Sequence, residues 1–135
     1  MPYPPYGGWN SEVQDKREVE SGFQPEIKPL SAKIEDYDII AIGTPTWWFA
    51  PAPAVRTFLH SQNWTGKVII PFMTHGGWPG HVIDEIKESC TGAKFLHSME
   101  IQFDSQGGSQ MHTSQEEIIN WIEHIKQDIN RGHYE

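Results

Sequence analysis

Two nearly continuous apolar runs, each followed by a loop and a helical pattern, constrain the fold of this chain most strongly. The first run is DIIAIG at Asp38–Gly43, and the second is KVIIPFMT at Lys67–Thr74. Runs that are apolar at successive positions are typical of strands buried on both faces of a parallel sheet. Pro71 cannot donate a ladder hydrogen bond, so we expect it near the end of its strand or at a bulge.

The rest of the chain supplies a third strand and three helices. We expect the strand at Lys94–Phe103, broken near His97–Ser98. The predicted helices span Pro53–Gln62, Val82–Cys90 and Thr113–Asn130. Strands that alternate with helices favour right-handed crossovers and a parallel sheet with helices on both faces. The sequence therefore predicts a three-layer α/β fold.

The last predicted helix has the clearest signals. Thr113 and Glu116 have the spacing of a capping box, which fixes the start of a helix. The residues at its helical spacing predict one buried stripe with Trp121 beside it: Ile118, Ile122, Ile125 and Ile129.

The length of 135 residues fits one domain. Residues 37–135 carry the alternating strand and helix patterns. Residues 1–36 are rich in proline and charge, so we expect an extended or irregular segment there that contributes little to a core.

Composition excludes several function classes. The net charge of −8 disfavours nucleic acid as a partner, because its phosphates need basic clusters. The sequence holds no apolar run of eighteen residues and no signal-peptide pattern, so we expect no membrane span. Cys90 is the only cysteine, which favours a reducing, cytoplasmic location. Histidine spacing predicts no metal site, and no catalytic nucleophile or base stands out.

Two loops carry the residues that point to a ligand. TPTWWFAPAP follows the first apolar run, and THGGWPGH follows the second. Loops at the carboxyl ends of neighbouring parallel strands meet at one edge of the sheet, where such folds bind ligands. Their tryptophans would stack on a flat ring, and their glycines would let the backbone approach it. The alternative is that these tryptophans cap the core or form a dimer contact.

At this point the sequence resembles the flavodoxin family. The resemblance is carried by DYDIIAIGTPTWWFAPAPAVRTFL, by GKVIIPFMTHGG and by the final acidic helix, and it extends over essentially all of the chain. It implies a flavodoxin-like fold and an electron-transfer protein or small quinone-type oxidoreductase that binds FMN. The implied partners are a redox protein or a small quinone-like acceptor. The residues it places beside the flavin are Thr44, Pro45, Thr46, Trp47, Trp48 and Phe49 on one side, and Thr74, His75, Gly76, Gly77 and Trp78 on the other.

The sequence departs from the family before its first apolar run. Flavodoxins begin with a strand, a phosphate-binding loop and a helix, and this chain has no matching segment, so we expect an N-terminally truncated version of the fold. SQGGSQMHTS at residues 105–114 is a glycine-rich loop before a helix, and it offers an alternative site for an anion such as the FMN phosphate. The missing strand would leave an open sheet edge, which predicts a homodimer through that edge or through exchanged N-terminal segments. The alternative function is a cofactor-free interaction module whose aromatic loops form an oligomer interface.

Overall fold

The computed structural model describes residues 16–106 and 108–132. After a short helix at residues 16–21, the elements are η1 (Ile34–Asp36), β1 (Ile39–Trp47), β2 (Ala50–Pro51), α2 (Pro53–Ser61), β3 (Val68–His75), α3 (Val82–Ser89), β4 (Lys94–Phe95), β5 (Met99–Gln102) and α4 (Gln115–Arg131). The strands alternate with helices as the sequence predicts.

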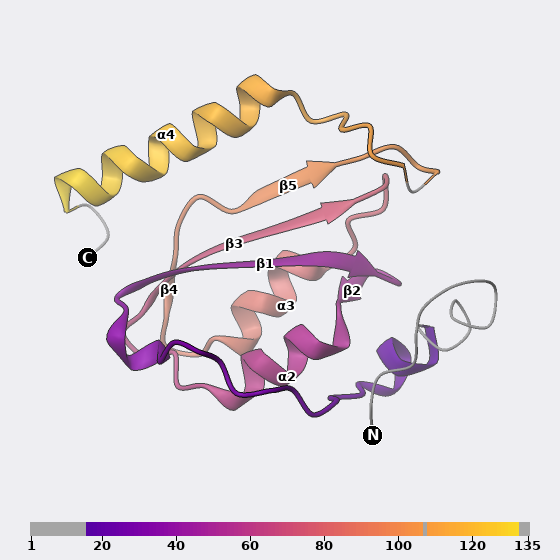
Figure 1. Cartoon of the computed structure of the whole chain (residues 1–135), viewed down its shortest axis with the longest axis horizontal. Coiled ribbons are helices and arrows are strands. Elements are labelled where there is room, and N and C mark those ends of the chain that lie inside the picture. The colour runs from indigo at the N-terminus through magenta and orange to yellow at the C-terminus, as the bar shows by residue number, and fades with distance from the viewer. Residues whose placement is uncertain (1–15, 107, 133–135) are drawn as a thin grey trace.

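The sheet is parallel except for its short β2 strand. Its order is β2-β1-β3-β4, and β5 also pairs with β3. β1 and β3 align in parallel from Ile39 opposite Val68 to Pro45 opposite Thr74. Helices α2 and α3 cover one face of the sheet and α4 lies over the other (Figure 1). This arrangement confirms the predicted three-layer α/β architecture with a parallel sheet.

Pro71 lies in the middle of β3, so the prediction that it would lie near the strand end or at a bulge is wrong. The third predicted strand is broken as expected, because β4 pairs with the start of β3 and β5 pairs with its second half. Ile69 accepts a hydrogen bond from the amide of Leu96 (3.0 Å) just before the break. Alternate residues of a strand direct their backbone groups to the same side. Pro71 therefore faces the gap between β4 and β5, where its missing N–H loses no partner.

The main core lies between the sheet and the α2–α3 layer. Its buried residues are Ile34, Ile42, Leu59, Trp64, Ile69, Met73, Val82, Ile86 and Cys90. Trp64 packs edge-on against Phe58 and donates its indole N–H to the carbonyl of Leu59 (2.8 Å). The first 36 residues contribute more than predicted, since Val19 and Ile34 are both buried.

The described N-terminal residues lie along the α2 side of the molecule (Figure 1). Arg56 on α2 donates to the carbonyl of Val19 (2.9 Å) and makes a two-pronged pair with Glu85 on α3 (2.7 and 2.9 Å). Thr57 donates to the carbonyl of Pro25 (2.6 Å). Within residues 16–106 and 108–132, no strand pairs with the outer edge of β1 along residues 39–45.

The N-cap of α4 is Ser114, one residue later than the Thr113 that the sequence predicts. Its capping box joins Ser114 and Glu117, not Thr113 and Glu116. The Thr113 hydroxyl instead accepts a hydrogen bond from the amide of Gln102 (2.7 Å) and so ties the loop to β5.

The buried stripe of α4 also differs from the prediction. Trp121 is half-buried and meets Phe72 of β3 at 5.4 Å between ring centroids. Ile118 and Ile125 lie on the same side of the helix as Trp121 and are half-buried. Ile122 and Ile129 were expected in that stripe, but they are 40% and 42% exposed.

Candidate functional site

The turn between β1 and β2 holds two aromatic residues in an uncommon backbone conformation. Trp47 pairs with Ala50, which leaves Trp48 and Phe49 as a two-residue hairpin loop. Their φ angles are +49° and +69°. Two-residue turns of this kind usually take Asn-Gly, because bulky residues at positive φ are strained. The turn exposes 42% of Trp48 and 53% of Phe49.

The loop between β3 and α3 touches this turn directly. The amide of His81 donates to the carbonyl of Phe49 (3.2 Å). Gly80 has φ +58°, and a Cβ added there would lie 2.3 Å from the carbonyl oxygen of Phe49. Only glycine fits such an approach, so the sequence Gly80–His81 holds the two loops together.

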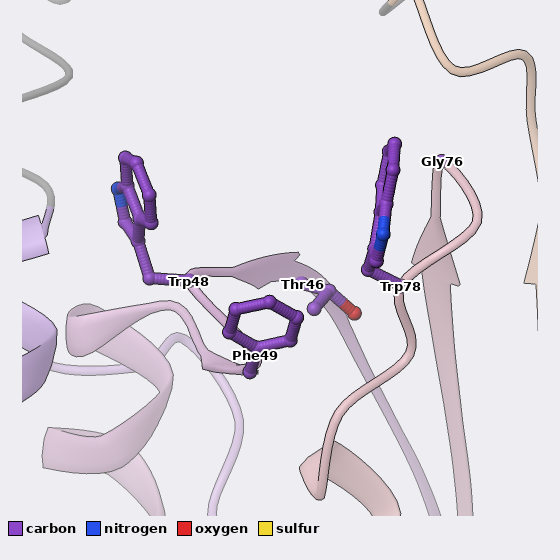
Figure 2. Close-up of a pocket in the computed structure, with 5 residues that line it drawn as sticks. All are labelled: Thr46, Trp48, Phe49, Gly76 and Trp78. Carbon is purple, nitrogen blue, oxygen red and sulfur yellow. The ribbon is translucent and has the colours of Figure 1, made fainter.

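The two loops enclose an apolar pocket of about 280 Å³. Trp48 and Trp78 stand on opposite sides of the open space, with Phe49 and Thr46 between them at its base (Figure 2). Gly76 completes the lining on the Trp78 side. The volume is just below the usual range for ligand pockets, about 300–1,000 Å³, which suits one ring system better than a whole nucleotide.

The structure brings together five of the eleven residues that the sequence singled out. The pocket is lined by Thr46, Trp48, Phe49, Gly76 and Trp78. The other six are not among its lining residues: Thr44, Pro45, Trp47, Thr74, His75 and Gly77.

The side chains of Thr44 and His75 make hydrogen bonds within the protein instead. The buried Thr44 hydroxyl accepts a hydrogen bond from the amide of Ala52 (3.1 Å) and donates to the carbonyl of Pro45 (2.9 Å). His75 accepts the amide hydrogen of Gly77 at its Nδ1 (3.0 Å), which fixes the shape of the β3–α3 loop.

Sequence reasoning missed Lys16. Its Nζ lies 5.5 Å from the centroid of the Trp48 ring, within the range of a cation–π contact. The contact joins residues 32 positions apart, and no motif in the sequence signals it. It places a positive charge against one wall of the pocket.

The glycine-rich loop at residues 105–114 uses its polar groups internally. The carboxylate of Asp104 accepts amide hydrogens from Gln106 (3.0 Å), Gly108 (2.9 Å) and Gln110 (3.3 Å). The Gly108 amide is the main cause that lowers the pKa of Asp104 below its ordinary value. The capping box of Ser114 and Glu117 closes the start of α4. The amides of Gln106, Gly108 and Gln110 are therefore occupied by the protein itself, which disfavours the anion alternative for the described part of this loop; Gly107 lies outside the described residues.

Three other features bear on the expected functions. No group of three or more histidine, cysteine or acidic side chains in the described part of the chain could hold a metal. Cys90 is fully buried, and burial raises the pKa of its thiol to about 11, so it is not a reactive nucleophile. None of the helices in the described ranges is long and apolar enough to span a membrane.

Comparisons with known proteins place this geometry in a family. A family model for flavodoxins matches residues 9–125. No curated protein matches the sequence.

Three solved structures share the fold. A protein of Bacteroides uniformis described as a flavoprotein is 23% identical with a TM-score of 0.66, and the match covers 85% of this chain and 70% of that one. A similarly described protein of Bacteroides eggerthii is 25% identical with a TM-score of 0.61, over 78% and 71% of the chains. A Lactobacillus acidophilus flavoprotein in complex with FMN is 20% identical with a TM-score of 0.53, over 68% and 62%.

The family match spans most of the sequence, and the parallel three-layer fold agrees with it. The chain belongs to the flavodoxin family.

Proposed function

We propose that this chain is a flavodoxin-like electron-transfer protein that holds the isoalloxazine ring of FMN between Trp48 and Trp78. The observation that carries the proposal is the apolar slot formed by these two indoles above Phe49. The family match and the FMN complex of the Lactobacillus acidophilus structure support it. When bound, the flavin supplies the one- or two-electron chemistry, and the protein supplies position and electrostatics.

The lining suits a flat heteroaromatic ring. Indole faces stack on planar ligands, and the Trp48–Phe49 turn holds its aromatic side chains at the mouth of the pocket. Gly76 lines the pocket without a side chain, so a ring edge can come close to its backbone. The apolar lining and the net charge of −8 disfavour negative charge on the reduced flavin and lower its reduction potential, whereas the positive charge of Lys16 against Trp48 acts in the opposite direction.

The phosphate of FMN finds no comparable cradle among the described residues. The amide groups of Gln106, Gly108 and Gln110 are directed to Asp104, and the start of α4 is closed by its own capping box. We therefore expect the ring to provide most of the affinity of the isolated chain. We also propose a cytoplasmic location and, as acceptor, a redox protein or a small quinone-like molecule.

A titration of flavin fluorescence tests the ring site. Riboflavin and FMN are each titrated with the purified chain, with its Trp78→Ala variant and with Tyr37→Ala as control. Tyr37 is half exposed and lies before β1, at the opposite end of the sheet. Quenching by the wild type and the control, with affinity at least about tenfold weaker for Trp78→Ala, supports the proposal because a stacked base or ring is worth about 1–3 kcal/mol. No quenching up to millimolar concentration contradicts it.

A cofactor-free interaction module is the second candidate, and the exposure of the pocket aromatics favours it. Trp48, Phe49 and Trp78 are 42%, 53% and 60% exposed. Their burial between two copies would form a homodimer. Sedimentation without flavin distinguishes the two candidate functions. If the aromatic residues form a dimer interface, Trp78→Ala changes the sedimenting mass of the protein.

A further inference from the structure

A positive charge contacts the Trp48 wall of the slot from the short helix at residues 16–21. The Nζ atom of Lys16 lies 5.5 Å from the centroid of the Trp48 ring. We propose that Lys16, acting through Trp48, sets the electrostatic part of the reduction potential of the flavin. Its single charge favours the negatively charged reduced flavin more than the net charge of −8 disfavours it. This inference rests on the flavin-binding function proposed above.

Lys16 meets Trp48 from outside the slot. Trp48 and Trp78 stand on opposite sides of the open space, and Lys16 is not among the residues that line it (Figure 2). The ammonium group therefore lies behind the indole, where it is attracted by the electrons of the ring face. None of the five described lining residues carries a charge, so no counter-charge in the lining offsets Lys16.

The helix that carries Lys16 is fixed to the rest of the protein. Val19, three residues further along it, is only 7% exposed. Its carbonyl accepts a hydrogen bond from Arg56 on α2 (2.9 Å), and Arg56 is itself paired with Glu85 on α3. These contacts hold the backbone of the short helix beside Trp48, so the charge of Lys16 acts at one wall of the slot.

Glu20 offsets only part of the Lys16 charge. The Nζ atom of Lys16 lies 3.9 Å from Oε1 of Glu20, four residues further along the same helix. The two side chains are 54% and 66% exposed, and exposed pairs contribute little because water and salt screen them. Lys before Glu is also the less favourable order for a pair at this helical spacing.

The net charge of the chain acts on the slot more weakly than its size suggests. Coulomb interactions fall with distance, and exposed charges more than about 8–10 Å apart are largely screened at ordinary salt concentrations. Asp104 lies in the loop behind Gly76, where its carboxylate accepts hydrogen bonds from three backbone amides that offset part of its charge. One cation held against the Trp48 wall therefore outweighs a negative charge that is spread over the molecule.

Reduction of the flavin adds the charge on which Lys16 acts. At pH 8 riboflavin takes up two electrons and one proton, and the product carries one negative charge at N1. An opposite charge within about 4–6 Å of a carboxyl group lowers its pKa by about 1–3. Lys16 acts across an indole and is partly exposed, so removal of its charge should lower the ratio of affinities for reduced and oxidised riboflavin by about threefold to tenfold. A tenfold change of this ratio corresponds to about 30 mV for two electrons.

The affinities for both states of riboflavin test the proposal. Oxidised riboflavin is titrated in air, and riboflavin reduced with dithionite is titrated without oxygen, both at pH 8 and both by tryptophan fluorescence. The variants are Lys16→Gln, the charge-retaining Lys16→Arg and, as control, Lys94→Gln. Lys94 is exposed and pairs with Val68 at the end of the sheet opposite the pocket. Lys16→Gln and Lys94→Gln change the net charge equally, so the difference between them reports on where the charge lies.

We expect Lys16→Gln to lower the affinity ratio by about threefold to tenfold, through weaker binding of reduced riboflavin. Lys16→Arg and Lys94→Gln should leave the ratio unchanged. Glu20→Gln removes the counter-charge of Lys16 and should raise the ratio, a change of opposite sign that a purely structural role of the Lys16 side chain does not predict.

Two results would overturn this inference alone, in a wild type that binds oxidised riboflavin. One is an equal affinity ratio for Lys16→Gln and Lys94→Gln. The other is an equal loss of affinity for both states of riboflavin in Lys16→Gln, which would show that Lys16 only holds the Trp48 wall in place. If the wild type binds neither state, the proposed flavin-binding function fails, and this inference fails with it.

Discussion

A single methyl group at position 80 should separate the two loops of the pocket. In Gly80→Ala the new Cβ would lie 2.3 Å from the carbonyl oxygen and 2.6 Å from the Cα of Phe49. Both are backbone atoms of a turn that is already strained, so neither can move away without further loss of stability. The residue also has φ +58°, which costs a non-glycine residue about 1–2 kcal/mol.

Gly66 provides the matched control. It has φ +79°, and a Cβ there meets nothing within 4 Å. Gly66→Ala should therefore lower the free energy of unfolding only by the cost of the positive φ, about 1–2 kcal/mol. Gly80→Ala should lower the free energy of unfolding by this amount and by about 1–3 kcal/mol more for the steric overlap with Phe49. Urea unfolding of both variants measures the difference.

The same substitution should weaken the ring site. Movement of the Phe49 backbone breaks the hydrogen bond from His81 and widens the slot between Trp48 and Trp78. We expect riboflavin affinity to fall at least about tenfold for Gly80→Ala, a loss of about 1.4 kcal/mol, and to be unchanged for Gly66→Ala. If the two variants unfold within about 0.5 kcal/mol of each other and bind riboflavin equally, the loops are not pressed together as the structure shows.

Three further predictions concern the frame around the pocket. The carboxylate of Asp104 has a lowered pKa in the folded protein. Its contribution to stability is therefore present above the unfolded pKa of about 3.9 and is lost as the pH falls through the lower folded pKa. Between pH 7 and pH 2.5, the urea midpoint should fall more steeply for the wild type than for Asp104→Asn. Cys90, with its pKa raised to about 11, should react with a thiol reagent at pH 8 only after urea unfolds the protein, and fast labelling of the folded chain would refute its burial. Arg56→Met should lower the free energy of unfolding by about 1–2 kcal/mol, because it leaves Glu85 unpaired. Adding Glu85→Gln to the same chain should recover part of that stability. An unchanged urea midpoint for Arg56→Met would show that the pair contributes nothing.

The sequence predicted the strand and helix order because burial on both faces leaves a strong apolar signal. The runs at residues 38–43 and 67–74 became β1 and β3, and the pattern around His97 correctly indicated a broken strand. The position of Pro71 could not be predicted, since its tolerance depends on the gap between β4 and β5 in the neighbouring strand. That gap is a property of the assembled sheet.

The exposed stripe of α4 could not be predicted either. Ile118, Ile122, Ile125 and Ile129 all fit one helical face by spacing. In the structure Trp121 makes the contact with Phe72 and turns the helix, which leaves Ile122 and Ile129 exposed. The largest side chain, not the most regular spacing, decides which face of the helix meets the sheet.

The site was predictable as a pair of loops and less so as a set of residues. The sequence placed both loops at one sheet edge, and the pocket forms where they meet. The sequence could not show that the Thr44 hydroxyl accepts a hydrogen bond from the amide of Ala52, or that Lys16 lies against the ring of Trp48. These contacts depend on how the chain folds back on itself, which no local pattern records.

Indole signals in a ¹H–¹⁵N spectrum test the central claim most directly, because they report on each tryptophan separately. Trp64 and Trp121 donate their indole N–H groups to the carbonyls of Leu59 and His97, away from the pocket. On addition of riboflavin, we predict large ring-current shifts of the Trp48 and Trp78 signals and unchanged signals for Trp64 and Trp121. Saturating riboflavin that leaves the Trp48 and Trp78 signals in place would contradict a flavin ring held between them.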